Sequence, residues 1–234
     1  MRSQSSHTLA SIEYKYDKSG NILSKGGMSF VNEGWQLTSI IDDSSKKEIS
    51  SYEYTADGHL AKELDGSGGV VRTMDYDPLG QMTDLNSTKF VYDSRGRMVK
   101  ADTGNSVTYY PTTNYEVTVK GDTTTQTSYL FHQSRRASIS TDITDGKPSE
   151  PLTLYYHGDH LGSVVAVSGG DGEILTTYSY DDYGATTVKT GSDISRYKYS
   201  GKEAFEGLYY FGARFYDPRV CTFLFGTIGV THSY

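Results

Sequence analysis

The most chemically suggestive residues of this 234-residue chain lie in one short segment, His157-Gly158-Asp159-His160. With Ser163, such side chains could hold a metal ion or form part of a nucleophilic site. In an extended strand, the side chains of His157 and Asp159 share one face and that of His160 does not. No third ligand follows at a recognisable spacing, and Ser163 lacks the strand–turn–helix context of a nucleophile elbow. We therefore expect no metal, no cofactor and no enzymatic activity.

Tyrosine is the unusual feature of the composition. The chain has 21 tyrosines against 8 phenylalanines and one tryptophan, with 25 glycines and 5 prolines. Tyrosine favours strands and binding surfaces, and this glycine-to-proline balance favours short strands joined by tight turns. The net charge of −7 argues against a nucleic-acid partner or an anionic membrane. The longest basic runs, Lys46-Lys47 and Arg135-Arg136, are interpreted as solvated charges.

Three local features bear on location and assembly. Cys221 is the single cysteine, so it is either a buried thiol or half of an intermolecular disulfide in a homo- or heterodimer. Asn86 opens a glycosylation sequon. The N-terminus has no apolar segment typical of a signal peptide, and no stretch is long enough for membrane insertion. We expect an extracellular protein whose signal segment has been removed.

A repeated pattern runs through the chain and is clearest in its first half. Each copy begins with a strand-like segment that ends in an aromatic residue, in most copies with a second aromatic residue two positions before it. In the clear copies a glycine follows the later aromatic residue by four positions, and an apolar residue follows that glycine by two. The clear copies cover 14–22, 52–60, 75–82 and 90–98, and weaker ones cover 30–37, 109–115, 178–184 and 197–201. Alternating aromatics share one face of a strand, the aspartate bonds back to the turn, and glycine allows a positive φ.

Each repeat thus predicts one β-hairpin, and because a lone hairpin is marginal in water the units must pair edge to edge. The predicted fold is all-β, with tandem antiparallel β-hairpin repeats forming a curled sheet or open barrel. We expect a single domain over 1–234, with repeats in 12–150, a distinct segment in 151–224 and a tail in 225–234. Residues 203–206 are the one place where a helical turn is expected.

The final third carries three unusual motifs. They read Asp-His-Leu-Gly-Ser from Asp159, Gly-Lys-Glu from Gly201, and Gly-Leu-Tyr-Tyr-Phe-Gly-Ala-Arg-Phe-Tyr-Asp-Pro from Gly207. This segment closely resembles the core-associated region of Rhs/YD-repeat proteins, which carries DHLGS, GKE and GLYYFGARYYDP motifs in the same order. The resemblance is strong over 152–224 and looser over 12–110, where it rests on the tyrosine–aspartate (YD) repeats.

The resemblance implies two different roles. Large Rhs and Tc-toxin proteins wind such repeats into a hollow β-shell around a toxin and use an aspartate–proline element for self-cleavage. Here Thr227-Ile228 stands where Asp-Pro is expected, and no cargo domain follows. Some animal egg lectins of the galactose- and galacturonate-binding type resemble short stand-alone YD-repeat chains, and this chain is most similar to those.

The preferred hypothesis is therefore a non-catalytic lectin whose partners are galactose-like or galacturonic-acid glycans, without nucleic acid. Sugar recognition needs aromatic faces for the ring and carboxylates or guanidinium groups for the hydroxyls. The candidate ligand-binding residues are Asp159, His160, Tyr210, Arg214, Asp217 and Trp35. The structural alternatives are turn capping by the two aspartates, pairing of Arg214 with a buried carboxylate, and core filling by Trp35.

Two other classes remain open. One is a fragment or degenerate relative of an Rhs/Tc-toxin encapsulating shell that lacks self-cleavage and cargo, with unpaired edge strands. The other is a structural adhesin or egg-coat component without a defined ligand.

Overall fold

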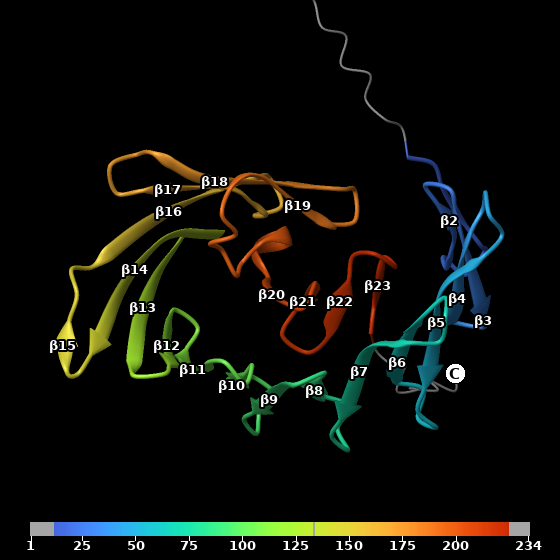
Figure 1. Ribbon diagram of the computed structural model, residues 1–234, viewed down its shortest axis with the longest axis horizontal. Helices are drawn as coiled ribbons and strands as arrows, with labels where there is room; N and C mark the ends of the chain where they lie inside the picture. The colour runs from blue at the N-terminus through green and yellow to red at the C-terminus, as the bar shows by residue number, and fades with distance from the viewer. Residues whose placement is uncertain (1–11, 133, 225–234) are drawn as a thin grey trace, which may run out of the picture. The chain divides into compact units, whose positions relative to one another are not determined.

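The structure, a computed structural model, describes residues 12–132 and 134–224 (Figure 1). In that part of the chain the elements are 23 strands and one short 3-10 turn, which confirms the all-β fold predicted from the repeats. No helix among the described residues is long and apolar enough to cross a membrane. Thr227-Ile228, where the resemblance placed a self-cleavage element, lies outside the described residues.

The described chain divides into two compact units, one up to Arg72 and one from Thr73 onward. The prediction of a single domain over 1–234 stays a prediction. In unit 1, each strand pairs antiparallel with the next along the chain. Its strands are β1 (Tyr14–Tyr16), β2 (Ile22–Lys25), β3 (Met28–Glu33), β4 (Gln36–Asp42), β5 (Glu48–Tyr54) and β6 (Leu60–Asp65). The next strand, β7 (Val70–Tyr76), crosses the division.

Unit 2 continues the antiparallel pairing, with β14 bonded to both β15 and β16. Its strands are β8 (Met82–Leu85), β9 (Thr88–Tyr92), β10 (Met98–Asp102), β11 (Val107–Thr112), β12 (Tyr115–Lys120), β13 (Thr123–His132), β14 (Ser134–Thr144), β15 (Lys147–Pro148), β16 (Leu152–Gly158), β17 (Val164–Gly169), β18 (Ile174–Tyr180) and β19 (Thr186–Gly191). A separate small sheet follows η1 (Tyr199–Gly201) and contains β20 (Glu203–Phe205), β21 (Leu208–Tyr210), β22 (Phe215–Asp217) and β23 (Thr222–Phe223).

One turn recurs between the strands. In each copy an aspartate Oδ1 accepts hydrogen bonds from the backbone N–H groups two and four residues later, and a glycine at the third position has positive φ. The aspartates are Asp17, Asp65, Asp77, Asp93, Asp159 and Asp181. This geometry confirms the roles predicted for the aspartate and the glycine of the repeat, and gives the chain an Rhs/YD-repeat-like β fold.

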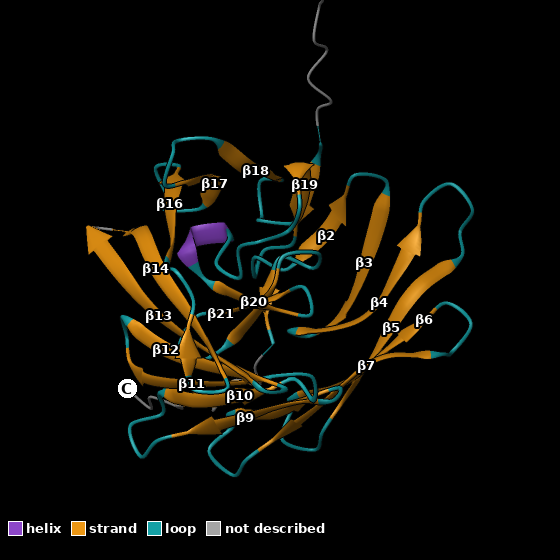
Figure 2. Cartoon of the chain, turned by 60° about the vertical axis from the view of Figure 1, so that its left-hand side comes forward, coloured by secondary structure: helices purple, strands orange, loops and turns teal. Residues whose placement is uncertain are grey.

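The small C-terminal sheet lies on the concave side of the curved sheet that β9–β19 form within unit 2, as both ribbon views show (Figures 1 and 2). Aromatic contacts hold it there: the ring of Phe90 on β9 lies 5.0 Å from that of Phe205 and 5.1 Å from that of Phe215. At the other end of the curve, the Tyr209 hydroxyl donates to the carbonyl of Gly184 at 2.8 Å. Leu208 on β21 is fully buried.

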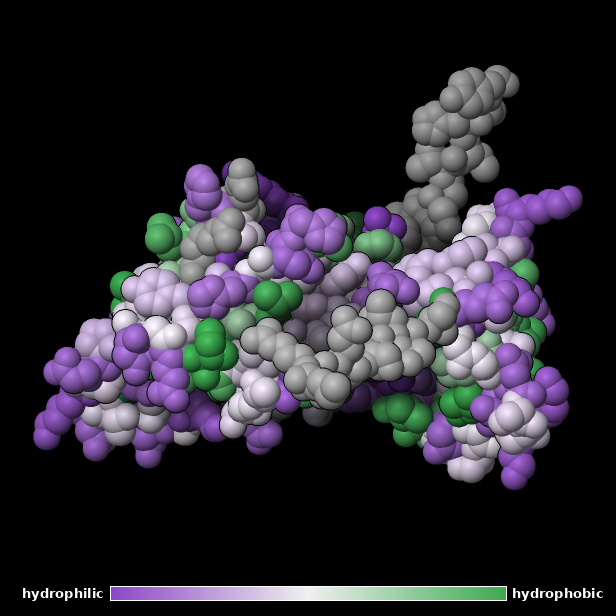
Figure 3. All heavy atoms as spheres, turned by 90° about the horizontal axis from the view of Figure 1, so that it is seen from above, coloured by the Kyte–Doolittle hydropathy of each residue, from purple (hydrophilic) through white to green (hydrophobic). Residues whose placement is uncertain are grey.

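The face of the molecule seen in Figure 3 is mostly hydrophilic. On the face seen in Figure 3, hydrophobic residues form small separate groups among hydrophilic ones. Exposed apolar residues scattered in this way are ordinary for a folded protein and mark no binding surface by themselves. A pocket of unit 2 lies where the C-terminal sheet meets the curved sheet.

Candidate functional site

The structure places Asp159 and His160 in a turn between β16 and β17. The Asp159 carboxylate accepts from the backbone N–H groups of Leu161 at 2.9 Å and Ser163 at 2.8 Å, as in the other aspartate turns. His160 is exposed in the same turn. The DHLGS motif thus closes a hairpin, which is the structural alternative that the sequence left open for Asp159.

The other predicted ligand residues of the C-terminal sheet face different surroundings. Asp217 is 1% exposed, accepts from the backbone N–H of Arg219, and forms an ion pair of 2.6 Å with its side chain. The Arg214 guanidinium lies 4.4 Å from the centre of the Phe223 ring, beside a pocket that Arg95 also lines. Tyr210 lines a different pocket, described below. The predicted residues are therefore not gathered into one site.

Trp35, Asn86 and Cys221 occupy turns or their edges. Trp35 is 49% exposed, packs edge-to-face on Tyr54 with ring centres 6.2 Å apart, and covers the turn glycine Gly58. The Asn86 amide oxygen accepts from the backbone N–H of Thr73 at 2.9 Å, and its amide nitrogen donates to Glu206. Cys221 has a φ of 57° and is partly buried. Glycosylation and a disulfide between chains stay predictions.

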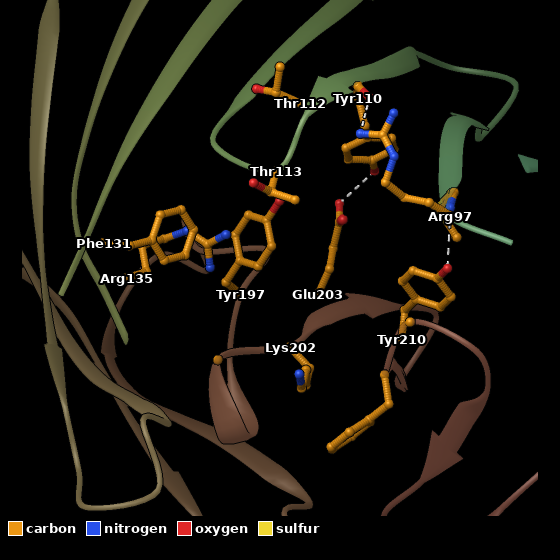
Figure 4. A pocket seen from close by; sticks show the side chains of 14 residues that line it. Arg97, Tyr110, Thr112, Thr113, Phe131, Arg135, Tyr197, Lys202, Glu203 and Tyr210 are labelled. Atoms are coloured by element: carbon orange, nitrogen blue, oxygen red, sulfur yellow. Dashed lines mark hydrogen bonds between the residues drawn. The ribbon is translucent and has the colours of Figure 1, made fainter. Parts of the chain in front are cut away.

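The strongest candidate site is a pocket of about 340 Å³ between β11, β13, β14 and the C-terminal sheet (Figure 4). It is rich in aromatic and basic side chains and has one carboxylate. The residues that define its chemistry are Tyr110, Phe131, Tyr197, Tyr210, Phe211, Arg97, Arg135, Lys202 and Glu203. Its volume falls in the range of small-ligand pockets, roughly 300–1,000 Å³.

A largely buried ionic network adjoins this pocket, which two of its members, Tyr110 and Glu203, line. The Glu203 carboxylate accepts from the Tyr110 hydroxyl at 2.9 Å and lies 3.3 Å from Nη1 of Arg196. The same Arg196 pairs with Glu116, which also accepts from the hydroxyl of Tyr129 at 2.6 Å. Burial raises the pKa of Glu203, and the positive charge of Arg196 opposes that shift.

Arg135 stands apart from this network. Its guanidinium carbon lies 3.1 Å from the centre of the Tyr197 ring, 4.4 Å from that of Tyr129 and 4.9 Å from that of Phe131. Figure 4 shows it between Phe131 and Tyr197. Arg135 is only 7% exposed, and its Nε has no hydrogen-bond partner. The interpretation of the Arg135-Arg136 pair as solvated charges is therefore wrong for Arg135.

Lys202 and Arg97 add positive charge to the pocket. The Lys202 ammonium lies 5.0 Å from the centre of the Phe211 ring, and among the described residues no carboxylate is within ion-pair distance of it. Arg97 is already engaged, with Nε 3.3 Å from Asp93 and Nη1 donating to the Tyr110 carbonyl at 3.2 Å. Two cations, Arg135 and Lys202, thus face the pocket without a paired acid, a setting that favours an anionic ligand.

The sequence predictions missed most of this pocket. Only Tyr210 was chosen, although Lys202 and Glu203 stand in the quoted Gly-Lys-Glu motif. No local pattern marks Arg135 or Tyr197, because they come from β14 and from the segment before η1 and meet only through the fold. Within the described residues, no group of three or more His, Cys, Asp or Glu side chains is placed to hold a metal ion.

Comparison with known proteins gives relatives of a particular kind. No family model matches the chain. The chain is 29% identical over 231 residues to the tRNA3(Ser)-specific nuclease WapA of Bacillus spizizenii, and 28% identical over 231 residues to the tRNA nuclease WapA of Bacillus subtilis strain 168. Each match covers 91% of this chain, and the chain spans 9% of the length of each relative.

Solved structures with a similar arrangement include a crystal structure of TcdB2-TccC3, at 15% identity and a TM-score of 0.45. That match covers 92% of this chain and 18% of the other. A Photorhabdus luminescens Tc holotoxin pore matches with a TM-score of 0.48 at 15% identity, covering 95% of this chain and 18% of the other.

These relatives overturn several expectations. The lectin hypothesis, with galactose-like or galacturonic-acid glycans as partners, is wrong, because the relatives are named as tRNA nucleases. The same finding contradicts the expectations of no enzymatic activity and no nucleic-acid partner. The alternative hypothesis, a fragment of an Rhs/Tc-toxin shell, did not include a nuclease either. The lectin hypothesis assumed that the many tyrosines form an exposed surface for sugar binding. Several, including Tyr156, Tyr178 and Tyr209, are buried and fill the core of unit 2.

Proposed function

We propose that this chain is part of a tRNA-cleaving protein of the WapA kind. The observation that carries the proposal is the sequence identity of 28–29% over 91% of the chain to proteins named as tRNA nucleases. Because the chain spans 9% of those relatives, the nuclease activity is proposed for the whole protein. The part described here would supply a rigid β-framework and a place for RNA to bind.

The pocket of unit 2 supports an RNA-directed role. RNA-binding proteins recognise unstacked nucleotides by stacking bases on aromatic rings or arginine planes and by contacting phosphates with cations. Tyr197, Phe131 and Phe211 supply rings, and Arg135 and Lys202 supply positive charge. With a net charge of −7, the chain is better suited to hold one nucleotide locally than to follow a long phosphate backbone.

The test is an assay of the full chain with total tRNA. Denaturing gels would follow cleavage, and filter retention would follow binding, with ribosomal RNA fragments and duplex DNA as competitors. We expect this chain to retain tRNA in preference to both competitors, whereas cleavage is expected of the whole protein. Because few phosphates are contacted, retention should depend on salt more weakly than it does for a basic RNA-binding protein. Absence of both binding and cleavage at equimolar tRNA would overturn the proposal.

A further inference from the structure

A buried cation without a counter-ion is the feature that calls for explanation. Arg135 is 7% exposed, and none of its donor groups has a hydrogen bond or an ion pair among the described residues. Burying an unpaired charge is costly, and buried charges in proteins are normally paired. The rings of Tyr129, Phe131 and Tyr197 offset part of this cost through cation–π contacts. They leave the guanidinium N–H groups without acceptors.

The two neighbouring carboxylates, Glu116 and Glu203, already bind other side chains. Glu116 accepts from Arg196 and from the hydroxyls of Tyr129 and Tyr197, the latter at 3.2 Å. Glu203 accepts from Tyr110 and pairs with Arg196. These carboxylates lower the electrostatic cost of Arg135 at a distance without accepting its hydrogen bonds. Among the described residues, neither carboxylate therefore serves as an acceptor for Arg135.

The aromatic surroundings of Arg135 suit an oxyanion. A guanidinium stacked against aromatic faces keeps its N–H donors in its own plane, where they match two oxygens of a phosphate in bidentate geometry. Lys202 lines the same pocket and adds a second cation without a paired carboxylate. The rings of Phe131 and Phe211 line the pocket too, so a ligand could combine a phosphate with a flat ring.

We propose that Arg135 is the phosphate-binding residue of a nucleotide site in this pocket, with Lys202 as a second phosphate contact and the surrounding rings stacking the base. The ligand class is a nucleoside monophosphate, either free or as the phosphorylated end of an RNA strand. The RNA source rests on the proposed function, whereas the site itself rests on the geometry of Arg135.

Isothermal titration of the full chain with 5′-AMP tests the site. Adenosine and inorganic phosphate, the two halves of 5′-AMP, are titrated separately for comparison. We expect 5′-AMP to bind at least tenfold more tightly than either half. Arg135→Lys keeps the charge but loses the bidentate donors, and should weaken 5′-AMP binding at least tenfold. Lys202→Met should weaken it severalfold. Arg95→Met is the matched control, because it removes an exposed arginine outside the pocket and should leave binding unchanged.

Folding is checked for each variant by circular dichroism, and Lys202→Met carries the test if the Arg135 variant does not fold. Equal affinity for adenosine and 5′-AMP, or unchanged binding in the variants, would overturn the proposal. Competition by a short 5′-phosphorylated RNA, and not by its unphosphorylated form, identifies an RNA end as the source. Binding of 5′-AMP alone identifies a free nucleotide. If 5′-AMP binds while tRNA is neither bound nor cut, the site stands and the proposed function fails.

Discussion

The Glu203 carboxylate lies 3.3 Å from Nη1 of Arg196, and this pair joins the C-terminal sheet to the segment that precedes it. The Glu203 side chain is 7% exposed, whereas that of Arg196 is 37% exposed. Burial lowers the pKa of Arg196, but Glu203 and Glu116 outweigh burial and hold it well above its usual range. Arg196 is therefore a permanent positive charge that pairs with two buried carboxylates.

Replacing that charge should destabilise unit 2 strongly. Arg196→Met removes the ion-pair partner of Glu203 and Glu116, and breaking a buried ion pair in this way costs about 3 kcal/mol. Denaturant unfolding of the variant should therefore show a lower midpoint. Glu203→Gln keeps the shape and removes one of the two acids, so it should cost less than Arg196→Met. Equal stability of Arg196→Met and the parent chain would mean that the network contributes no net stability.

A second ion pair offers a comparison within unit 1. Arg72 and Glu63 lie 3.3 Å apart and are 7% and 4% exposed, whereas Lys62 and Glu53 lie 3.0 Å apart and are about half exposed. Arg72→Met should cost about 3–5 kcal/mol, because it removes one partner of a buried ion pair. Lys62→Met should cost about 0–1 kcal/mol, because water screens the exposed pair. Similar losses in the two variants, measured by denaturant unfolding, would contradict this difference.

The repeats explain why the fold could be predicted from sequence. A tyrosine pair, an aspartate and a glycine at fixed spacing specify a strand, a turn and a return strand locally, as Asp93 and Gly96 illustrate. Local rules failed at residues 203–206, where a helical turn was expected. There Glu203–Phe205 forms β20, because Glu203 pairs with Tyr210 of β21 and with the adjacent segment that carries Arg196. Tertiary contacts overrode local preference at this point.

The candidate site was beyond local rules for the same reason. Tyr110 and Glu203 are 93 residues apart in sequence and share a hydrogen bond of 2.9 Å. Arg135 belongs to no motif of recognisable spacing. In a chain of net charge −7, the Arg135-Arg136 pair therefore resembled two ordinary solvated charges. The identities of the ring neighbours, Tyr129, Phe131 and Tyr197, decide its environment, and only the fold brings Tyr197 to it.

Two turn glycines separate backbone strain from steric contact. Gly184 and Gly172 have φ values of +94° and +87°, so alanine at either position is strained by about 1–2 kcal/mol. A Cβ at Gly184 would lie 2.4 Å from the Tyr199 ring, whereas one at Gly172 meets nothing within 4 Å. Gly184→Ala should therefore cost about 1–3 kcal/mol more than Gly172→Ala, because the ring must move. Thermal unfolding of both variants measures the two losses of stability. Equal losses would show that the Tyr199 ring moves aside without a cost in free energy.

Asp42 gives a pH dependence whose sign follows from its contacts. Hydrogen bonds from the Ser44 hydroxyl and from the Ser45 backbone N–H, each at 2.6 Å, lower the pKa of Asp42 from 3.8 to about 2. Since the folded-state pKa lies below the unfolded value, the stabilising contribution is fully present above pH 3.8. It is lost as the pH falls toward about 2.

Asp42→Asn isolates this contribution from those of the other turn aspartates. The difference in free energy of unfolding between the parent chain and Asp42→Asn should be constant above about pH 5 and shrink as the pH falls through the interval between the two pKa values. Denaturant unfolding at a series of pH values supplies the difference curve, and NMR titration of the Asp42 carboxyl carbon reports its pKa directly. A difference that stays constant down to pH 2, or an Asp42 that titrates near 3.8, would mean that the serine contacts do not favour the charged form.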